Sequence, residues 1–413
     1  MKKKYLALLI VISTTMVPVG CSKVSSENVV LGTEKVVIDD NTKDKKNEDF
    51  QIKKVAEIEN LEPGPNNSML YVNENIIQLI YQYSGNGIGE VRIGKLDSDN
   101  KINWTNKNAD CEIYKNFIYN GIYPTKIKKD SKVYTVNKEG DLEELAGYTK
   151  FIEEHGNLLN YHYSYRNGTI DEVFFGSDQD PNLAIIDNQN EKYYVIPKEL
   201  KRNDKEGALS EVLGIDGDRM YVSYVYADID NSISHEVNKG DDVDISNEVK
   251  ITVGYIENNK FTKILSEDDG IKINHGGEMI YENGRILFSG LAEGKNGIWN
   301  YDIDNKKLTK IVDVDSGTFF EFHINENKDK VVISSMKAAS KSDEKQNNTL
   351  IIANINDKLE LTNITNIVTN TEERHYKGFA GWANDGETFY IKSTIYDGNY
   401  NGTHNLEVYN IIE

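Results

Sequence analysis

The sequence predicts an all-β fold for the body of the chain, and two observations support this prediction. From about residue 50 onward, short runs of Ile, Val, Tyr, Phe and Leu alternate with clusters of Asn, Asp and Gly, a pattern typical of strands and turns. The second observation is that one strand–turn–strand element recurs along this body. Few stretches have helical spacing, so we expect little helix.

The recurring element is a hairpin whose second strand often ends in Lys-Ile or a similar pair. Its seven copies span residues 91–104, 132–145, 183–196, 251–264, 298–311, 350–361 and 406–412. The seventh copy stops before a second strand. Each copy therefore contributes two neighbouring strands, except the last, which contributes one.

A second strand pair with a tight turn precedes several copies. Its turns are Asp216-Gly217, Asn283-Gly284 and Asp385-Gly386, which accept the positive φ angles of two-residue hairpin turns. Two hairpins per unit make a four-stranded sheet. Units that recur every ~40 to 70 residues are typical of the blades of a β-propeller.

Counting the units predicts a β-propeller of seven four-stranded blades. Six or eight blades, and an array of β-sandwiches that does not close, are the alternatives. The last unit lacks its outer strand, and residues 51–58 form an orphan strand near the start of the body. We expect this N-terminal strand to complete the last blade and close the ring, because an open ring would expose two sheet edges.

One segment carries a family resemblance. Residues 381–391 read Gly-Trp-Ala-Asn-Asp-Gly-Glu-Thr-Phe-Tyr-Ile and resemble the TolB-type propeller repeat, in which Trp-Ser-Pro-Asp-Gly precedes an apolar strand. Trp382, Asp385 and Gly386 match that repeat, whereas Ala383 and Asn384 replace its Ser-Pro. The resemblance covers one blade, so it implies an architecture and no ligand.

The N-terminus has the pattern of an export signal. Lys2, Lys3 and Lys4 precede an uncharged, mostly apolar run from Tyr5 to Gly20. This run is shorter than the ~20 residues that span a bilayer with ease. We therefore interpret residues 1–20 as a signal peptide.

Cys21 follows this signal directly. The segment resembles bacterial lipoproteins, in which a small residue precedes a cysteine that receives diacylglycerol. Val19 and Gly20 fit that pattern, while Pro18 stands where the family usually has Leu. The resemblance implies that Cys21 is the lipid attachment site; an uncleaved anchor and a cleavage without lipid are the alternatives.

Residues 21–49 are rich in Ser, Asn, Lys, Asp and Glu, so we expect a flexible tether that carries the lipidated Cys21. The propeller domain then spans residues 50–413. If Cys21 is acylated, Cys111 has no partner among the two cysteines of the chain, and we expect it to be a structural thiol. The fold must then be stable without disulfides.

The net charge of −20 bears on the possible partners. Removing residues 1–20 takes away three lysines and no acidic residue, which leaves −23. Such acidity repels nucleic acid. It also gives no attraction to anionic lipid, so we expect the lipid anchor to hold the protein on the extracytoplasmic face of the cell membrane.

The sequence contains no recognisable catalytic constellation and implies no cofactor. The seven histidines have no metal-ligand spacing, no Gly-x-Ser-x-Gly elbow occurs, and paired carboxylates cannot be assigned from spacing alone. Acidic clusters are weak candidates for calcium, because oxygen-rich loops can hold this ion. They are Asp228, Asp230, Asp241, Asp242 and Asp244, and a solvated loop is the alternative.

These observations favour a non-enzymatic binding or interaction module for a protein, peptide or glycan. Its contacts would come from loops on one rim, especially the insertions 228–248 and 338–348. Clustered tyrosines at 161–165, 221–226 and 396–400 either pack between strands or form a binding platform. The alternative function is an extracellular polysaccharide hydrolase or lyase, which would need carboxylates beside an Arg or His and aromatic walls.

Overall fold

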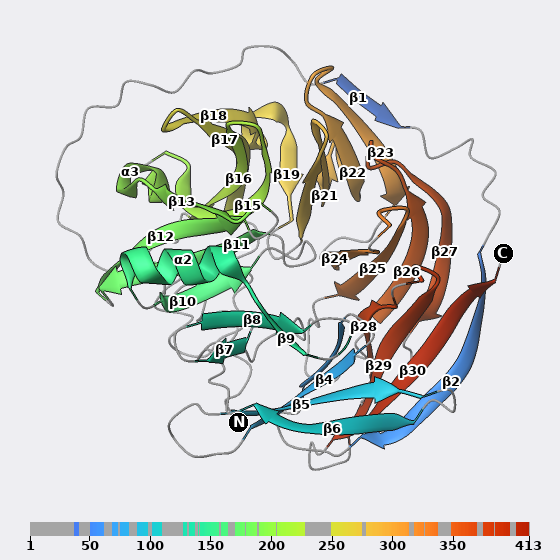
Figure 1. The fold of residues 1–413 in the computed structure, drawn as a ribbon. Coiled ribbons are helices and arrows are strands. Elements are labelled where there is room, and N and C mark those ends of the chain that lie inside the picture. Colours follow the sequence, from blue (N-terminus) through green and yellow to red (C-terminus); the bar gives the residue numbers. More distant parts are fainter. Residues whose placement is uncertain are drawn as a thin grey trace, which may run out of the picture.

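The computed structural model describes residues 37–40 and, with internal gaps, residues 50–412. The longest internal gaps are 62–67, 82–88, 110–126, 164–169, 228–248, 338–347, 370–374 and 397–401. The described part is built almost entirely from strands, which confirms the all-β prediction (Figure 1). No helix in the described part is long and apolar enough to cross a membrane.

The strands of the described part form seven sheets, numbered here in chain order. The first holds β3 (Ser68–Val72), β4 (Asn75–Tyr81), β5 (Gly89–Leu96) and β6 (Ile102–Ala109), and the second holds β7 (Ile127–Lys129), β8 (Lys132–Val136) and β9 (Leu142–Glu144). The third holds β10 (Leu158–Tyr163), β11 (Ile170–Ser177), β12 (Asp180–Asp187) and β13 (Lys192–Ile196). The fourth holds β14 (Arg202–Asn203), β15 (Gly207–Asp216), β16 (Arg219–Ala227), β17 (Val249–Glu257) and β18 (Lys260–Leu265).

The remaining three sheets come from the C-terminal half, with one strand each added to two of them from the N-terminus. The fifth holds β19 (Ile271–Ile273), β20 (Met279–Glu282), β21 (Arg285–Ala292), β22 (Lys295–Asp302) and β23 (Lys307–Asp313), with β1 (Val37–Asp40) at its edge. The sixth holds β24 (Thr318–Ile324), β25 (Lys330–Lys337), β26 (Asn348–Ile355) and β27 (Leu361–Thr369). The seventh holds β28 (His375–Trp382), β29 (Thr388–Tyr396), β30 (Gly402–Ile412) and β2 (Gln51–Leu61).

All of the predicted hairpins are present as antiparallel pairs. The recurring element is the pair that ends each of the first six sheets, for example β22 with β23 and β26 with β27. Of the three predicted two-residue turns, the one at Asn283-Gly284 is present as predicted, the one at Asp216-Gly217 is shifted to Gly217 and Asp218, and residues 383–387 form a longer connection around Asp385-Gly386. Asn283 and Gly284 have φ angles of 45° and 74°, as the turn between β20 and β21 requires.

The predicted pairing of the N-terminal strand is confirmed. β2 lies antiparallel to β30, with Gln51 opposite Ile412 and Ile58 opposite Leu406. The seventh sheet therefore contains four strands although the C-terminal segment supplies only three.

Five features differ from the uniform four-stranded units that the repeats predict, and one of them is the short extra strand β14 at the edge of the fourth sheet. The second sheet has three described strands, and the inner strand of the fifth sheet is split into β19 and β20, which both pair with β21. β1 lies inside the segment expected to be a tether and pairs in parallel with β23. The helix α2 (Ala146–His155) follows β9, and α3 (Lys198–Lys201) follows β13.

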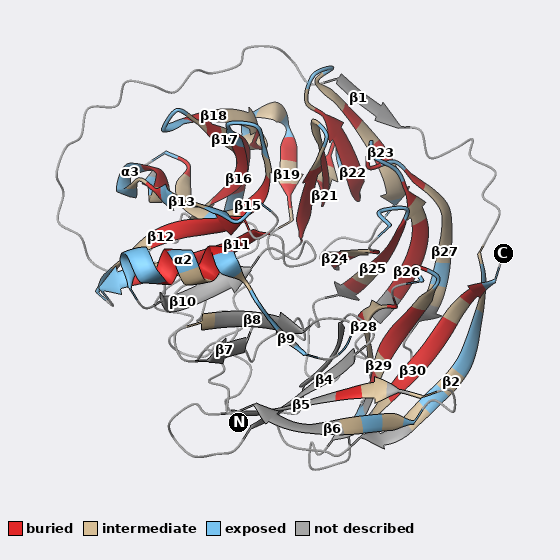
Figure 2. Ribbon diagram, in the orientation of Figure 1, coloured by how far each residue is buried: buried red, intermediate tan, exposed pale blue. Residues whose placement is uncertain are grey.

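Neighbouring sheets pack face to face through apolar side chains. The clusters join the third sheet to the fourth, the fourth to the fifth, the fifth to the sixth, the sixth to the seventh, and the seventh to the first. Figure 2 shows the buried residues concentrated in the middle of these strands, and Figure 1 shows the sheets following one another around a common centre. Burial on both faces explains why the strands have long apolar runs.

The TolB-like segment forms the turn between β28 and β29. Asp385 accepts hydrogen bonds from the backbone N–H groups of Glu387 at 2.9 Å and Thr388 at 2.7 Å, and from the Thr388 hydroxyl at 2.7 Å. Gly386 adopts a φ of 73°, which a residue with a Cβ would adopt with strain. These two residue types are therefore required by the turn itself.

Candidate functional site

The interface between the sixth and seventh sheets combines titratable and aromatic side chains. The His323 ring of β24 stacks on the Phe379 ring of β28, with centroids 4.6 Å apart and planes 20° from parallel. The Trp382 indole donates a hydrogen bond to the His323 carbonyl oxygen at 2.8 Å. These contacts place the inner strands of the two sheets side by side.

The alternation of β24 explains which residues reach this interface. Phe320 and Phe322 lie in the core cluster shared with the fifth sheet. Successive side chains in a strand point to opposite faces, so Glu321 and His323 lie on the face toward the seventh sheet. Lys377 lies two residues before Phe379 in β28, just as Glu321 lies two residues before His323 in β24.

His323 is held neutral in this interface. Burial lowers the pKa of its imidazole to about 4, so it carries no charge at neutral pH. Its Nε2 atom lies 3.3 Å from the Ser334 hydroxyl and 3.7 Å from a Glu321 carboxylate oxygen. The Ser334 hydroxyl and the Glu321 carboxylate thus both approach Nε2 of His323. In a triad that activates a nucleophile, the hydroxyl and the carboxylate contact different ring nitrogens.

The pKa of Glu321 is shifted in the opposite direction from that of His323. Burial raises the pKa of its carboxyl group to about 7, so it exchanges a proton near neutral pH. About a third of the side chain remains exposed, at 34%. A carboxyl group with this pKa and this access to solvent has the properties of a general acid or base.

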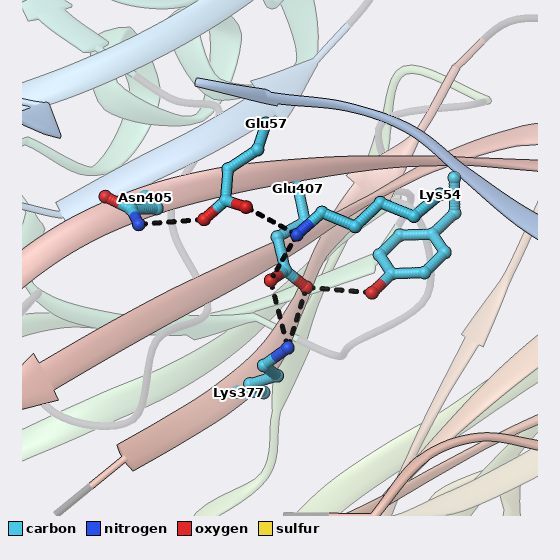
Figure 3. A network of polar contacts seen from close by, with 6 residues as sticks. Lys54, Glu57, Lys377, Asn405 and Glu407 are labelled. Atoms are coloured by element: carbon cyan, nitrogen blue, oxygen red, sulfur yellow. Dashed lines mark hydrogen bonds and ion pairs between the residues drawn. The ribbon is translucent and has the colours of Figure 1, made fainter. Parts of the chain in front are cut away.

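The seventh sheet also carries a polar network (Figure 3). Glu407 of β30 is buried, and its carboxylate accepts hydrogen bonds from Lys54 at 3.0 Å, Lys377 at 2.9 Å and Tyr409 at 2.9 Å. Burial disfavours its charge, but the bonds from Lys377, Lys54 and Tyr409 outweigh this effect and hold the pKa of Glu407 below its ordinary value. The carboxylate is thus charged and fully coordinated.

The network extends to the edge of the sheet through Glu57. Its carboxylate accepts a hydrogen bond from Lys54 at 2.5 Å and another from the Asn405 amide at 2.9 Å. The participating residues come from β2, β28 and β30, as Figure 3 shows. The network thus links the N-terminal strand β2 to the C-terminal strand β30. Its donors and acceptors bond to one another.

Two buried carboxyl groups join other neighbouring sheets. Glu172 of β11 accepts a hydrogen bond from the Val212 backbone N–H of β15 at 2.7 Å, and Glu278 accepts one from the Phe322 backbone N–H of β24. Burial raises the pKa of Glu172 to about 8, against the hydrogen bond from Val212 and with the repulsion of Asp171. Both acids link one sheet to a strand of the next.

These buried and interface residues were not predicted from the sequence. The segment Ile170-Asp-Glu-Val-Phe-Phe175 places two acids inside an apolar strand, which is a signal that could have found Glu172. Glu321 and His323 alternate with phenylalanines in the same way. Their partners on other sheets have no signature in sequence spacing.

The site residues named from the sequence fall mostly outside the described part of the chain. Cys21, Cys111 and the five calcium candidates, Asp228, Asp230, Asp241, Asp242 and Asp244, all lie there, as does nearly all of both insertions. Within the residues that the structure describes, no group of three or more His, Cys, Asp or Glu side chains could hold a metal ion. The calcium prediction therefore remains a prediction.

The described histidine and tyrosine side chains differ in their burial: His155 is exposed, whereas Tyr221 is buried. The His155 ring lies 4.8 Å from the Phe151 ring, and its Nε2 atom is 3.3 Å from the Tyr193 hydroxyl. Tyr221 is buried and stacks on Tyr281 with centroids 3.7 Å apart. The packing interpretation of Tyr221 is therefore confirmed.

Comparisons with known proteins give only distant structural similarity. No family model matches the chain, and no curated protein matches it. The propeller domain of the Trilobed protease from Pyrococcus furiosus, which has an open velcro topology, is 13% identical over 82% of this chain and 94% of its own, with a TM-score of 0.41. TolB from Acinetobacter baumannii is 13% identical over 79% of this chain and 78% of its own, with a TM-score of 0.33.

A prolyl endopeptidase is also similar. It is 13% identical over 62% of this chain, with a TM-score of 0.37, and this chain spans 36% of its length. At these identities and scores, function has to be argued from the residues of this chain.

Proposed function

We propose that the protein is a lipid-anchored, extracytoplasmic binding module whose seven sheets are the blades of a closed β-propeller. The consecutive face-to-face packing from the third sheet to the seventh and on to the first supports this closure. The pairing of β2 with β30 gives the last blade its outer strand. The ligand is a protein, a peptide or a glycan.

The observation that carries the binding function is the common position of the long insertions. Residues 228–248 connect β16 to β17, and residues 338–347 connect β25 to β26. If the strands of each sheet are counted from the outer strand, β18 or β27, each insertion connects the third strand to the second. Equivalent connections leave equivalent blades on the same rim, so both insertions belong to one rim of the propeller.

The polar groups at the described interfaces support a binding role over a catalytic one. Glu407, Glu172 and Glu278 accept hydrogen bonds from neighbouring strands, and His323 is neutral and stacked. These groups stabilise the blades, which leaves the rim connections for recognition. Loops positioned by a rigid scaffold are the usual place for binding residues.

Replacing residues 229–247 and 339–347 by short Gly-Ser linkers tests this proposal. We expect loss of partner capture in a pull-down from intact cells, with a melting temperature within a few degrees of the wild type, since neither insertion lies within a described strand. A control variant keeps both insertions at their full lengths but replaces their residues by Gly and Ser. Undiminished capture by the shortened variant would contradict the proposal.

The anchor has its own test. We expect Cys21→Ser to move the protein from the membrane fraction to the soluble fraction, because acyl chains are the attachment. Cys111→Ser serves as the control and should leave the protein with the membrane. Retention of the Cys21→Ser variant in the membrane would favour an uncleaved anchor.

Glu321 and His323 favour a second candidate, a hydrolase or lyase acting on extracellular polysaccharide. Glu321 titrates near neutral pH, is partly exposed and lies beside a neutral imidazole, which stacks on the Phe379 ring. A glycan-degradation screen with the wild type and Glu321→Gln tests this candidate. Degradation that the substitution abolishes would favour the enzyme over the binding module.

A further inference from the structure

The outer edge of the fifth sheet differs from those of the other sheets. β23 is the outer strand of its hairpin, yet Val37–Asp40 pair with it in parallel as β1 (Figure 1). In the described part of the chain, the outer strands β6, β9, β13, β18, β27 and β2 end their sheets without a further strand. One propeller edge has therefore recruited a strand from outside its own repeat.

We propose that the outer edge of β23 is a strand-addition site for an extended acidic peptide, which the protein's own residues 37–40 occupy in the absence of a partner. This proposal is separate from the rim function proposed above. It concerns the perimeter of the propeller and main-chain recognition, in which an extended peptide adds a strand to a sheet edge.

The register defines the chemistry of the occupant. Val37 lies opposite Lys307, Ile38 opposite Leu308, Asp39 opposite Thr309 and Asp40 opposite Lys310. The occupant thus consists of two β-branched residues, which favour strands, followed by two acidic residues. Two of the four β23 positions are lysines.

Charge favours an acidic occupant over a neutral one. The chain carries a net charge of −20, and the charged residues of β23 opposite β1 are both lysines, Lys307 and Lys310. Lys310 is buried and forms an ion pair with Asp313 at 2.5 Å, so the contribution of charge at this edge comes from Lys307. We therefore assign the affinity to backbone hydrogen bonds and the choice of partner to charge.

The short connection after β1 keeps the intramolecular occupant in place. Nine residues, 41–49, separate Asp40 from Phe50 at the start of the propeller body. A short connection gives a docked segment a high effective concentration, so an external peptide must compete with it. A peptide that binds β23 weakly therefore cannot displace β1, whereas a peptide that binds tightly can.

β18 provides an internal control for this argument. It contains Phe261-Thr262-Lys263-Ile264, and β23 contains the closely similar Leu308-Thr309-Lys310-Ile311. Both are outer strands, but only β23 has an added strand. Hydrogen exchange measured at both β18 and β23 of one protein therefore distinguishes an effect of the added strand from an effect common to outer strands.

The test uses the mature chain with Cys21→Ser, with and without Ile38→Pro. Proline removes a backbone donor from β1 and disrupts its pairing, so hydrogen exchange should accelerate about tenfold or more at those amides of residues 307–310 that face β1 instead of β22. Exchange of residues 261–264 should not change. Val30→Pro, outside β1, is the matched control and should behave like the parent chain.

A peptide of residues 33–44 then tests capture in trans. It should restore protection to residues 307–310 of the Ile38→Pro variant and bind the parent chain about tenfold more weakly, because the parent's own strand competes. The same peptide with Asp39→Lys and Asp40→Lys should bind neither. These outcomes do not depend on the rim insertions, so they are distinguishable from failure of the proposed rim function.

Three results would overturn the proposal. The first is unchanged exchange at residues 307–310 in Ile38→Pro. The second is equal binding of the acidic and the lysine-substituted peptides. The third is protection of β23 that rises with protein concentration, which would assign the added strand to a second copy of the chain.

Discussion

The indole nitrogen of Trp382 lies 2.8 Å from the carbonyl oxygen of His323, and this bond joins the TolB-like segment to the preceding sheet. The same Trp382 ring packs edge-on against Phe379 and Phe389. The tryptophan of this segment thus links two sheets, which a strand–turn–strand pattern alone does not reveal.

Trp382→Phe should keep most of the ring packing and lose this hydrogen bond. We expect the free energy of unfolding to fall by about 1 to 2 kcal/mol, because a partly buried carbonyl oxygen loses its donor. Denaturant unfolding measures this change. An NMR titration of His323, whose pKa is about 4, should show a midpoint shifted upward as water gains access. An unaltered unfolding curve and an unaltered titration would contradict this role.

Glu407→Gln should weaken the joint between β2 and the rest of the seventh sheet. The substitution leaves Lys377 with a neutral partner in a buried setting, so we expect a loss of roughly 2 to 4 kcal/mol of stability. A double-mutant cycle with Lys377→Met should give a coupling of about 1 kcal/mol or more. The matched control pair, Lys54 with Glu57, is more exposed and should couple by less than ~0.5 kcal/mol.

The pH dependence of the same group follows from its lowered pKa. A carboxyl group with a folded-state pKa below the ordinary 4.5 stabilises the fold above that value and loses this contribution as the pH falls through the folded pKa. Wild-type stability should therefore drop more steeply below pH 4.5 than that of Glu407→Gln. Parallel curves for the two proteins would contradict the assignment.

Glu172 should show the opposite pH dependence. Its pKa is raised from 4.5 to about 8, so the folded state holds a proton that the unfolded state releases, and stability falls as the pH rises from 4.5 to 8. Glu172→Gln stays neutral and keeps an acceptor for Val212. We expect it to be more stable than the wild type at pH 9 by roughly 3 kcal/mol and similar to it at pH 5. Thermal unfolding at both values measures this, with Glu57→Gln as the control.

A truncation series should locate the start of the cooperative fold. A chain that begins at residue 46 keeps β2, whereas one that begins at residue 62 lacks it and exposes the edge of β30. We expect the first to melt near the wild type and the second to lose several degrees and to aggregate. Equal melting temperatures would show that β2 contributes nothing to stability.

The hairpins were predictable because their signals are local. Turn residues such as Asn283-Gly284 lie between two apolar runs, and the leftover strand at residues 51–58 matched the missing strand of the last unit. Pairing within one sheet follows chain order almost throughout. The pairing of strands within a sheet can therefore be predicted from signals in consecutive residues.

The interfaces between sheets were not predictable in the same way. His323 meets Phe379, and Glu172 meets Val212, only after the sheets have packed. The helix α2 was also missed, although its buried residues Gly147, Tyr148, Phe151 and Ile152 follow a helical spacing. Its ten residues are too few for the period to stand out against the surrounding strands.

The position of β2 has a mechanical consequence. Gln51, at the start of β2, lies opposite Ile412 at the end of β30, so tension that has separated β1 from β23 acts next on this ladder. The ion pair between Lys54 and Glu407 lies a few residues further along the same ladder. A pull on the N-terminus therefore strains the fifth and then the seventh sheet, through their edge strands β1 and β2, before any force reaches the other five sheets.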